Sequence, residues 1–349
     1  MKKKLRFAGF TFCWLCLAFV LGTIAYSIHF SAFAEPRQLE AAAAIAAERV
    51  IENYADERFE VVSLVFRLAE RPEYAVTSRN FQIMLNRHFD DFRGHPAVAY
   101  TADYLIPNYN IGFAAPFALA MHLVQTPDGF VLRDNLDHLL QRTPWTQETA
   151  TKFVEFLNDF YIDTNFADFF IEQTNYFNQH NTRFYEGTYQ HVNFDFFAPY
   201  LNLDNVRIVI SPSNQWIRTV ARVQSDTPGE DYIYIALPAI PGRTNFMTLH
   251  LWVINQYIAL IAPPIAERLY AESEDFRMWA DTSAQLRNER RFGARIESSQ
   301  TVAQYYVTRA FVLSYLREAM GSDLLDQVER EIERDLIYIE EVIMLIWGD

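Results

Sequence analysis

Hydrophobic residues return at helical spacing along most of the chain. From about residue 41 to residue 70, an Ala-rich run leads into apolar positions that recur every three or four residues, which predicts one helix with a buried stripe. The same spacing predicts further helices at about 78–92, 110–123, 144–161, 167–192, 299–319 and 322–346. Most of the chain is therefore expected to be α-helical.

Two short segments have the composition and alternation of β-strands. Residues 206–211 (VRIVIS) are dense in β-branched side chains, and residues 232–238 (YIYIALP) alternate aromatic and aliphatic positions. The polar loop between them has room for a further short strand at 217–223, and TPDGF at 126–130 predicts a tight turn between extended pieces. These segments predict a small β-sheet in a predominantly α-helical α+β fold.

Proline positions predict where two helices begin and end. Thr143 is a candidate N-cap with Pro144 at the first helical position. The apolar helix expected at 246–262 follows a loop rich in Pro and Gly, and Pro263 and Pro264 predict its end because neither can donate a helical hydrogen bond. A strand, a loop and a helix that carries His250 thus follow one another, which is the element order of zinc peptidases.

Residues 1–34 have the pattern of a targeting segment. Three lysines and Arg6 precede an uncharged apolar run at 7–27, and Ala-Phe-Ala at 32–34 has the form of a signal peptidase site. A cleaved signal peptide and an uncleaved signal anchor both fit this pattern. Either would export residues 35–349, expected to form one domain with a helical part (35–200) and a β-plus-helix part (201–349), and would limit membrane contact to the N-terminal segment.

The exported part is strongly acidic and contains no cysteine. The net charge of the whole chain is −14, and removal of a leader with four basic and no acidic residues lowers it to −18. Such a chain repels phosphate backbones, so we expect no nucleic-acid partner. Since both cysteines, Cys13 and Cys16, lie in the apolar leader, disulfides and a cysteine nucleophile are excluded from residues 35–349.

Several segments, in a fixed order, resemble one family of exported proteins. They are DERFEVVSLVFRLAERPEY (56–74), GHPAVAYTADY (94–104), GFAAPFALAMHL (112–123), YFNQHNTRFYEGT (176–188), VRIVISP (206–212) and the helix at 246–262. The chain resembles an uncharacterised exported domain family with a gluzincin-like H-E-x-x-H metallopeptidase signature. The resemblance covers residues 57–320 and implies a zincin-like, helix-rich domain.

The resemblance also shows what this chain lacks. In that family the helix carries L-x-H-E-F-x-H-x-F-x-N-P, in which two histidines share a helix face and bind zinc while the glutamate acts as base. The first histidine position is occupied by His250, the base position by Leu251 and the second ligand position by Ile254. The family's later acidic ligand aligns with Tyr305. We therefore expect no catalytic residue, no bound metal and no cofactor.

A single imidazole does not make a zinc site, which needs three or four protein ligands. The simplest expectation for His250 is a buried histidine hydrogen-bonded to the backbone or to a phenol such as Tyr305. The acidic run at 326–335 is interleaved with arginines and predicts a solvated helix face. No nucleophile-elbow, P-loop or dinucleotide motif occurs in the sequence.

The sequence is compatible with two functions. The first is an exported, catalytically inactive metallopeptidase-like protein that binds a peptide or protein segment in a vestigial cleft, with residues 232–238 as one wall beside His250. The second is an active zinc-dependent peptidase that uses ligands not recognised in the sequence. Convergence of three or more His, Asp or Glu side chains near His250 would favour the second.

Overall fold

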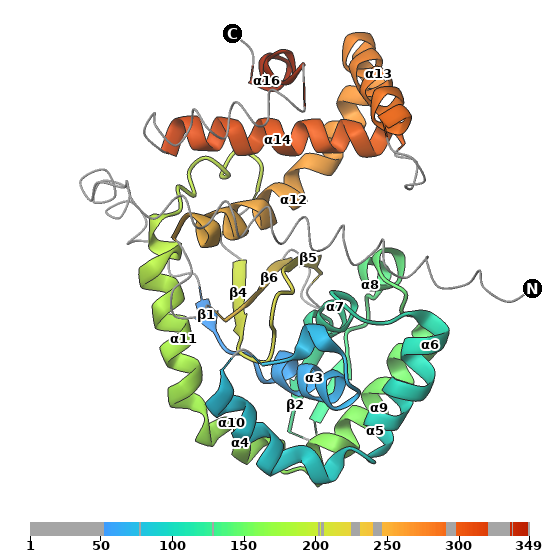
Figure 1. Ribbon diagram of the computed structural model, residues 1–349, viewed down its shortest axis with the longest axis vertical. Helices are drawn as coiled ribbons and strands as arrows, with labels where there is room; N and C mark the ends of the chain where they lie inside the picture. Colours follow the sequence, from blue (N-terminus) through green and yellow to red (C-terminus); the bar gives the residue numbers. More distant parts are fainter. Residues whose placement is uncertain are drawn as a thin grey trace, which may run out of the picture.

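The computed structural model describes residues 52–347, except for residue 77, residue 128, residue 202, residues 204–205, 225–230, 240–245, 291–297 and 320–335, and residue 337 (Figure 1). The predicted leader, its cleavage site, the Ala-rich run and the first part of the helix predicted at 322–346 lie outside the described residues. Within the described residues the mainly helical α+β class predicted from the sequence is confirmed.

The first half of the structure is a set of helices that surround α3 (Glu57–Leu68). The others are α4 (Arg79–Phe89), α5 (Pro96–Tyr100), the π-helix η4 (Thr101–Leu105), α6 (Ile106–Tyr109), α7 (Ala115–Met121), α8 (Asp137–Arg142), α9 (Gln147–Asp163), α10 (Phe166–Glu172) and α11 (Thr174–Gly187), with 3₁₀ turns η2 (Pro72–Tyr74), η3 (Asp90–Phe92) and η5 (Tyr189–His191). α3 is buried on nearly every side, which makes it the core helix of this half.

Side-chain caps fix several helix starts. The Asp56 carboxylate accepts the backbone N–H of Arg58 at the start of α3, and Thr146 and Thr149 form a capping box at the start of α9. The predicted start at Thr143 is wrong, because Thr143 instead follows the last residue of α8 and its hydroxyl donates to the Leu139 carbonyl. Thr146 provides the better cap since its hydroxyl and that of Thr149 satisfy each other's backbone N–H groups.

The main sheet has four strands in the order β1-β4-β6-β5. β1 (Glu52–Tyr54), β4 (Val206–Ser211) and β6 (Tyr232–Pro238) are parallel, whereas β5 (Thr219–Val223) is antiparallel to β6. A separate hairpin of β2 (Leu123–Thr126) and β3 (Gly129–Leu132) confirms the predicted turn. The prediction of one helix from about 41 to 70 is wrong at β1, where pairing with β4 overrides the local helical pattern.

The second half adds long helices above the sheet (Figure 1). They are α12 (Phe246–Glu272), α13 (Glu274–Arg290), α14 (Ser299–Ala319) and α16 (Ile339–Trp347). The predicted helix end at Pro263 and Pro264 is wrong, because α12 continues through both prolines. Contacts with α13 and α14 hold the two parts of α12 together although each proline removes a helical hydrogen bond.

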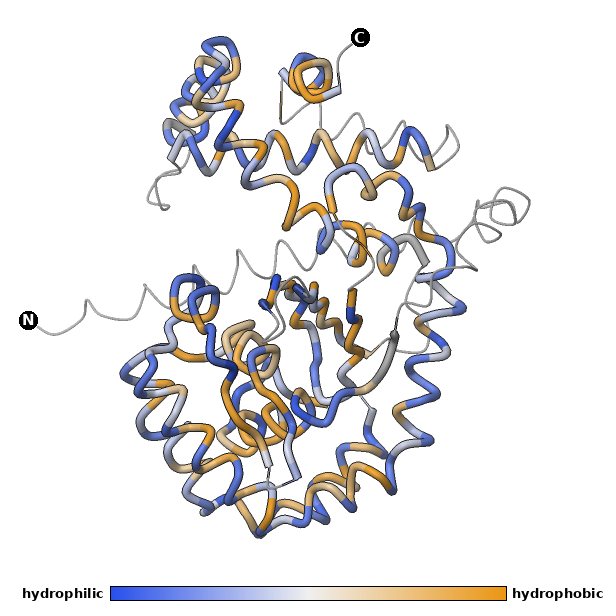
Figure 2. Tube along the Cα trace, turned by 180° about the vertical axis from the view of Figure 1, so that it is seen from behind, coloured by the Kyte–Doolittle hydropathy of each residue, from blue (hydrophilic) through white to orange (hydrophobic). Residues whose placement is uncertain are grey.

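Alternate residues of the sheet face two different cores. Val209, Tyr234 and Ala236 point toward the core built by α3, α7 and α9. Ile208, Ile235 and their neighbours on the same face point toward the core built by α12 and α14. Because both faces of the sheet are covered, its strands are largely hydrophobic, whereas α11 at the outside is mostly hydrophilic (Figure 2).

One described helical span, Leu249–Glu272, is long and apolar enough to cross a membrane by length and composition alone. Half of its most apolar window is buried inside the protein. Because α12 packs against α14 and β5 as a core helix does, this span is weak support for a membrane segment.

A carboxyl group is buried between α3 and the end of β4. Glu60 is 2% exposed, and neither of its carboxyl oxygens makes a hydrogen bond of normal geometry with a described residue. Burial raises the pKa of Glu60 to about 7, although the nearby Ser211 and Ser213 partly oppose the rise. Glu60 is therefore largely protonated in the folded protein below neutral pH.

We predict that Glu60 makes the fold less stable as the pH rises. The folded pKa lies above the unfolded value of about 4.3, so the stabilisation is complete below pH 4.3 and is lost as the pH rises through 7, by about 4 kcal/mol in total. Urea unfolding of Glu60→Gln, which mimics the neutral acid, should show a flatter pH profile than the wild type. Glu172→Gln, an exposed control on α10, should leave the profile unchanged, and identical profiles for all three proteins would contradict the prediction.

Candidate functional site

His250 lies in the second turn of α12 and is 2% exposed. Its ring nitrogen Nε2 is 2.8 Å from the hydroxyl of Tyr315 on α14. The phenol that the sequence analysis anticipated is therefore present, but it comes from Tyr315 and not from Tyr305. This contact joins the two longest helices of the second half, α12 and α14, which pack closely against each other.

The Tyr315 hydroxyl also accepts a hydrogen bond from the backbone N–H of Asn193, at 2.9 Å. When the imidazole carries its proton on Nδ1, the Tyr315 hydroxyl donates its one proton to Nε2. In that tautomer a chain of hydrogen bonds runs from the Asn193 amide through Tyr315 to the imidazole, and the Nε2 lone pair accepts the phenol proton. In either tautomer the phenol oxygen lies on the side of Nε2 that a metal ion would occupy.

Aromatic rings close the space around this hydrogen bond. The Tyr315 ring stacks on Phe197 with a centroid distance of 5.4 Å and an interplanar angle of 16°. Phe197 in turn stacks on Tyr257 at 5.1 Å, and Phe196 meets Tyr315 edge-on at 5.3 Å. The site is a packed aromatic cluster, and such pairs add stabilisation beyond the area they bury.

The buried pair is uncharged at ordinary pH. Burial lowers the pKa of His250 to about 4, with a smaller contribution from nearby His191. Burial also raises the pKa of the Tyr315 phenol. A neutral imidazole and a neutral phenol have no need of a counter-ion, so the cluster is stable without one.

The residues aligned with the base and the second zinc ligand, Leu251 and Ile254, have no side-chain group that could bind a proton or a metal. Ile254 is fully buried in the core between α12 and α14. Leu251 is half-buried and packs against the same core. Both side chains therefore contribute packing, and neither can accept a proton or bind a cation.

Tyr305 is not brought to His250. It lies ten residues before Tyr315 on α14, which places it about 15 Å away along the helix axis. Its ring lies between the guanidinium groups of Arg287 and Arg309, at 4.5 and 5.0 Å from the ring centroid. Tyr305 thus forms a cation-π stack at the other end of α14.

Within the described ranges, no three His, Cys, Asp or Glu side chains are grouped closely enough to hold a metal ion. The charge of His191, which follows α11 in the turn η5, lowers the pKa of His250. The unrecognised ligand set on which an active peptidase would depend is therefore not found among these residues.

The predicted peptide groove along residues 232–238 is wrong. β6 is hydrogen-bonded to β4 on one edge and to β5 on the other, so it has no edge left to pair with a peptide. The sheet has two end strands among the described residues: β1 pairs only with β4, and β5 pairs only with β6. β5 contacts α12 on one face and α7 on the other, so it lies beside the His250 helix.

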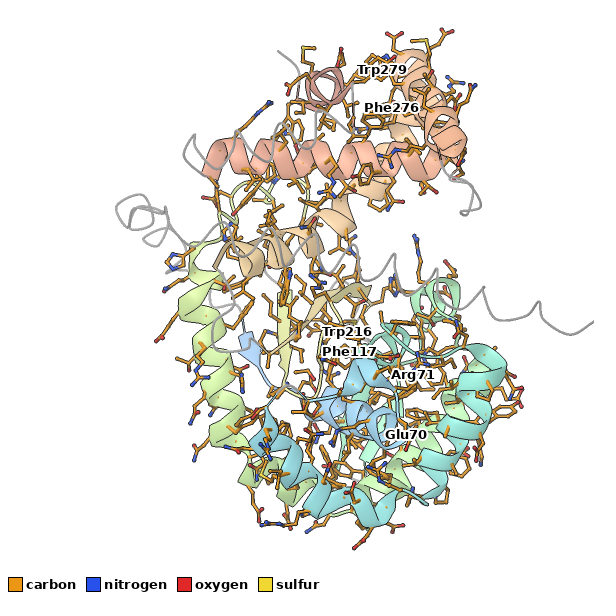
Figure 3. The ribbon with its side chains drawn as sticks, viewed as in Figure 1. Glu70, Arg71, Phe117, Trp216, Phe276 and Trp279 are labelled. Atoms are coloured by element: carbon orange, nitrogen blue, oxygen red, sulfur yellow. The ribbon has the colours of Figure 1, made fainter. Side chains whose placement is uncertain are left out.

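The loop that leads into β5 is held rigidly. The Asn214 side chain accepts the backbone N–H groups of Trp216 and Ile217 and donates to the Ile217 carbonyl. The Gln215 N–H donates to the Glu73 carbonyl at 3.2 Å, so the loop is tied to the segment after α3. The Trp216 side chain, labelled in Figure 3, is 44% exposed. This loop presents an aromatic side chain at the start of the edge strand.

Sequence reasoning missed the residues that complete this region. Tyr315 and Asn193 carry no motif, and only the fold brings them to His250. Arg218 precedes β5 and places its guanidinium carbon 4.5 Å from the ring centroid of Trp252 on α12. A weak signal was available for Arg218, because an arginine beside a candidate strand in an acidic chain is a potential anion site.

Comparison of the chain with protein-family models, with curated proteins and with solved structures gave no match. The resemblance to an H-E-x-x-H family thus rests on the sequence segments quoted above.

We predict that Tyr315→Phe destabilises the fold by about 1–3 kcal/mol, because it leaves both the Asn193 N–H and His250 Nε2 without a partner in a buried site. Tyr305→Phe is the matched control, since it keeps the ring that stacks between two arginines and should change the free energy of unfolding by less than about 0.5 kcal/mol. Guanidinium unfolding of the two variants measures both effects. Equal stability of the two variants would show that the hydrogen bond to His250 is not needed.

Proposed function

We propose that the protein is an exported, catalytically inactive metallopeptidase-like protein that binds an extended peptide or protein segment. The observation that carries the proposal is the 2.8 Å contact between His250 Nε2 and the Tyr315 hydroxyl. A zinc ion bound to this nitrogen would lie about 2.0–2.1 Å from it, on the side where the phenol oxygen lies. The packed core that replaces the metal position supports a scaffold role.

Peptide hydrolysis of this type needs an activated water and a group to take its proton. The positions that would supply the base and the second ligand are Leu251 and Ile254, which serve the core. The N-terminal pattern of basic residues and an apolar run supports export. Together these features favour a binding protein over an enzyme.

The binding element in this proposal is β5. An edge strand presents backbone N–H and C=O groups that an extended segment can pair with, and this mode of recognition needs no metal. β5 lies beside α12, which carries the altered zinc motif, so binding along β5 keeps the general position at which zinc peptidases hold their substrates. The rigid loop before β5 supports a preformed site.

We predict that the full-length chain, purified in mild detergent, carries no stoichiometric zinc after mild chelation and dialysis and has no chelator-sensitive peptidase activity. Metal analysis of the wild type and of His250→Ala tests this directly. Stoichiometric zinc that is lost in His250→Ala, together with peptidase activity that a chelator abolishes, would favour the active peptidase instead.

We also predict that a saturating extended peptide slows hydrogen exchange of backbone amides in β5. A suitable probe is the neutral heptapeptide acetyl-Thr-Gln-Thr-Val-Thr-Gln-Thr-amide, which has high strand propensity. The same peptide with every amide N-methylated cannot pair with a strand edge and serves as the control. Protection confined to another part of the chain, or equal protection by both peptides, would refute β5 as the binding edge.

A further inference from the structure

Arg218 is a half-buried arginine without an anionic partner among the described residues. Its guanidinium lies over the Trp252 ring, 4.5 Å from the centroid. Burial lowers the pKa of Arg218, but a guanidinium stays protonated at physiological pH. Its five N–H donors lie in a fixed plane and reach solvent, where they can bond water or a bound anion.

Strand alternation places a second arginine on the same face. Residues two apart along a strand point to the same side, so Arg218, Val220 and Arg222 share one face. Val220 packs against the core that contains α12, whereas Ala221 belongs to the core on the other side of the sheet. Arg222 is exposed and also lacks a carboxylate partner in the described part of the chain. The two arginines are four residues, or about 13 Å, apart along the strand.

The elements next to this face contain no carboxylate of their own. α7, β6 and the part of α12 from Phe246 to Ala266 have no Asp or Glu. Described acidic residues lie toward the end of β5 away from Arg218: Asp231 directly precedes β6, whose Tyr232 pairs with Val223, and Asp137 is on α8, which contacts β5. In an exported part with net charge −18, the Arg218 end of this face is therefore locally basic.

We infer that Arg218, Val220 and Arg222 select an extended acidic segment with two carboxylates four residues apart and an apolar residue midway between them. The inference rests on the proposed function, because it requires a segment paired with the β5 edge. Side chains directly opposite each other across paired strands lie about 5 Å apart, so each carboxylate would face one arginine and the apolar residue would face Val220. Paired N–H groups of a guanidinium match a carboxylate in geometry and charge.

The test compares three peptides on the full-length chain by fluorescence anisotropy at moderate salt. The matched acidic peptide is acetyl-Thr-Glu-Thr-Val-Thr-Glu-Thr-amide, and the neutral peptide has glutamine at both glutamate positions. In the third peptide, acetyl-Thr-Glu-Thr-Val-Glu-Thr-Thr-amide, the same two charges point to opposite faces. We expect the matched peptide to bind at least about tenfold more tightly than either other peptide, which corresponds to about 1.4 kcal/mol and is within what one charge-assisted hydrogen bond supplies.

Variants then assign the selectivity to the two arginines. Arg218→Gln and Arg222→Gln should each remove most of the preference for the acidic peptide, with the larger loss for the half-buried Arg218. Binding of the neutral peptide should change little. Arg87→Gln, at an exposed arginine on α4, is the control and should bind all three peptides as the wild type does. Higher salt should weaken the acidic peptide selectively.

The outcomes separate this inference from the proposed function. Equal binding of the acidic and neutral peptides, with β5 protected in both, overturns the acidic selection and leaves edge binding intact. Equal binding of the matched and displaced acidic peptides overturns the two-carboxylate register. Failure of every peptide to protect β5 overturns the proposed function itself. If Arg218→Gln destabilises the free chain and leaves peptide preference unchanged, a carboxylate of this chain outside the described residues is the partner, and the inference is wrong.

Discussion

The fold depends on the fact that its two central strands are buried on both faces. In β4 and β6 almost every residue is buried, so neither face can be left to solvent. The helices of the first half cover one face of the sheet, and α12 and α14 cover the other. The interior is therefore divided into two cores with the sheet between them. This constraint positions α12 against the sheet whatever chemistry its residues carry. It also leaves β1 and β5, at the two ends of the order, each with an unpaired edge among the described strands, and β5 is the one that contacts α12.

The same constraint makes the surroundings of His250 ordinary core. A buried imidazole without a partner is costly. Tyr315 provides the partner, and its hydroxyl also accepts the Asn193 amide N–H. Phe197 and Tyr257 then stack in series on the phenol ring. One hydrogen bond and a run of aromatic contacts therefore stabilise the junction of α12 and α14 in the absence of any coordinated charge.

How much of this could be predicted from the sequence depends on the range of the interactions involved. The strands at 206–211 and 232–238 and the helix α14 follow from local periodicity, and the structure has them at those positions. β1 did not follow, because its conformation comes from pairing with β4, about 150 residues away in sequence. The course of α12 through Pro263 depends likewise on packing against α13 and α14. For the site, the sequence predicted that His250 is buried and hydrogen-bonded to a tyrosine. It could not predict that this tyrosine is Tyr315 and not Tyr305, because that depends on where α14 crosses α12.

The edge position of β5 has a further physical consequence. An edge strand that presents only backbone groups pairs with extended chains of any sequence and is an aggregation hazard, and charged side chains on the edge are the usual protection against this. Arg222 is exposed and can play that part, and Arg218, half-buried over the Trp252 ring, adds a second cation just before the strand. Under the inference made above, both arginines would also select among extended segments, because a carboxylate placed opposite either of them gains a charge-assisted hydrogen bond.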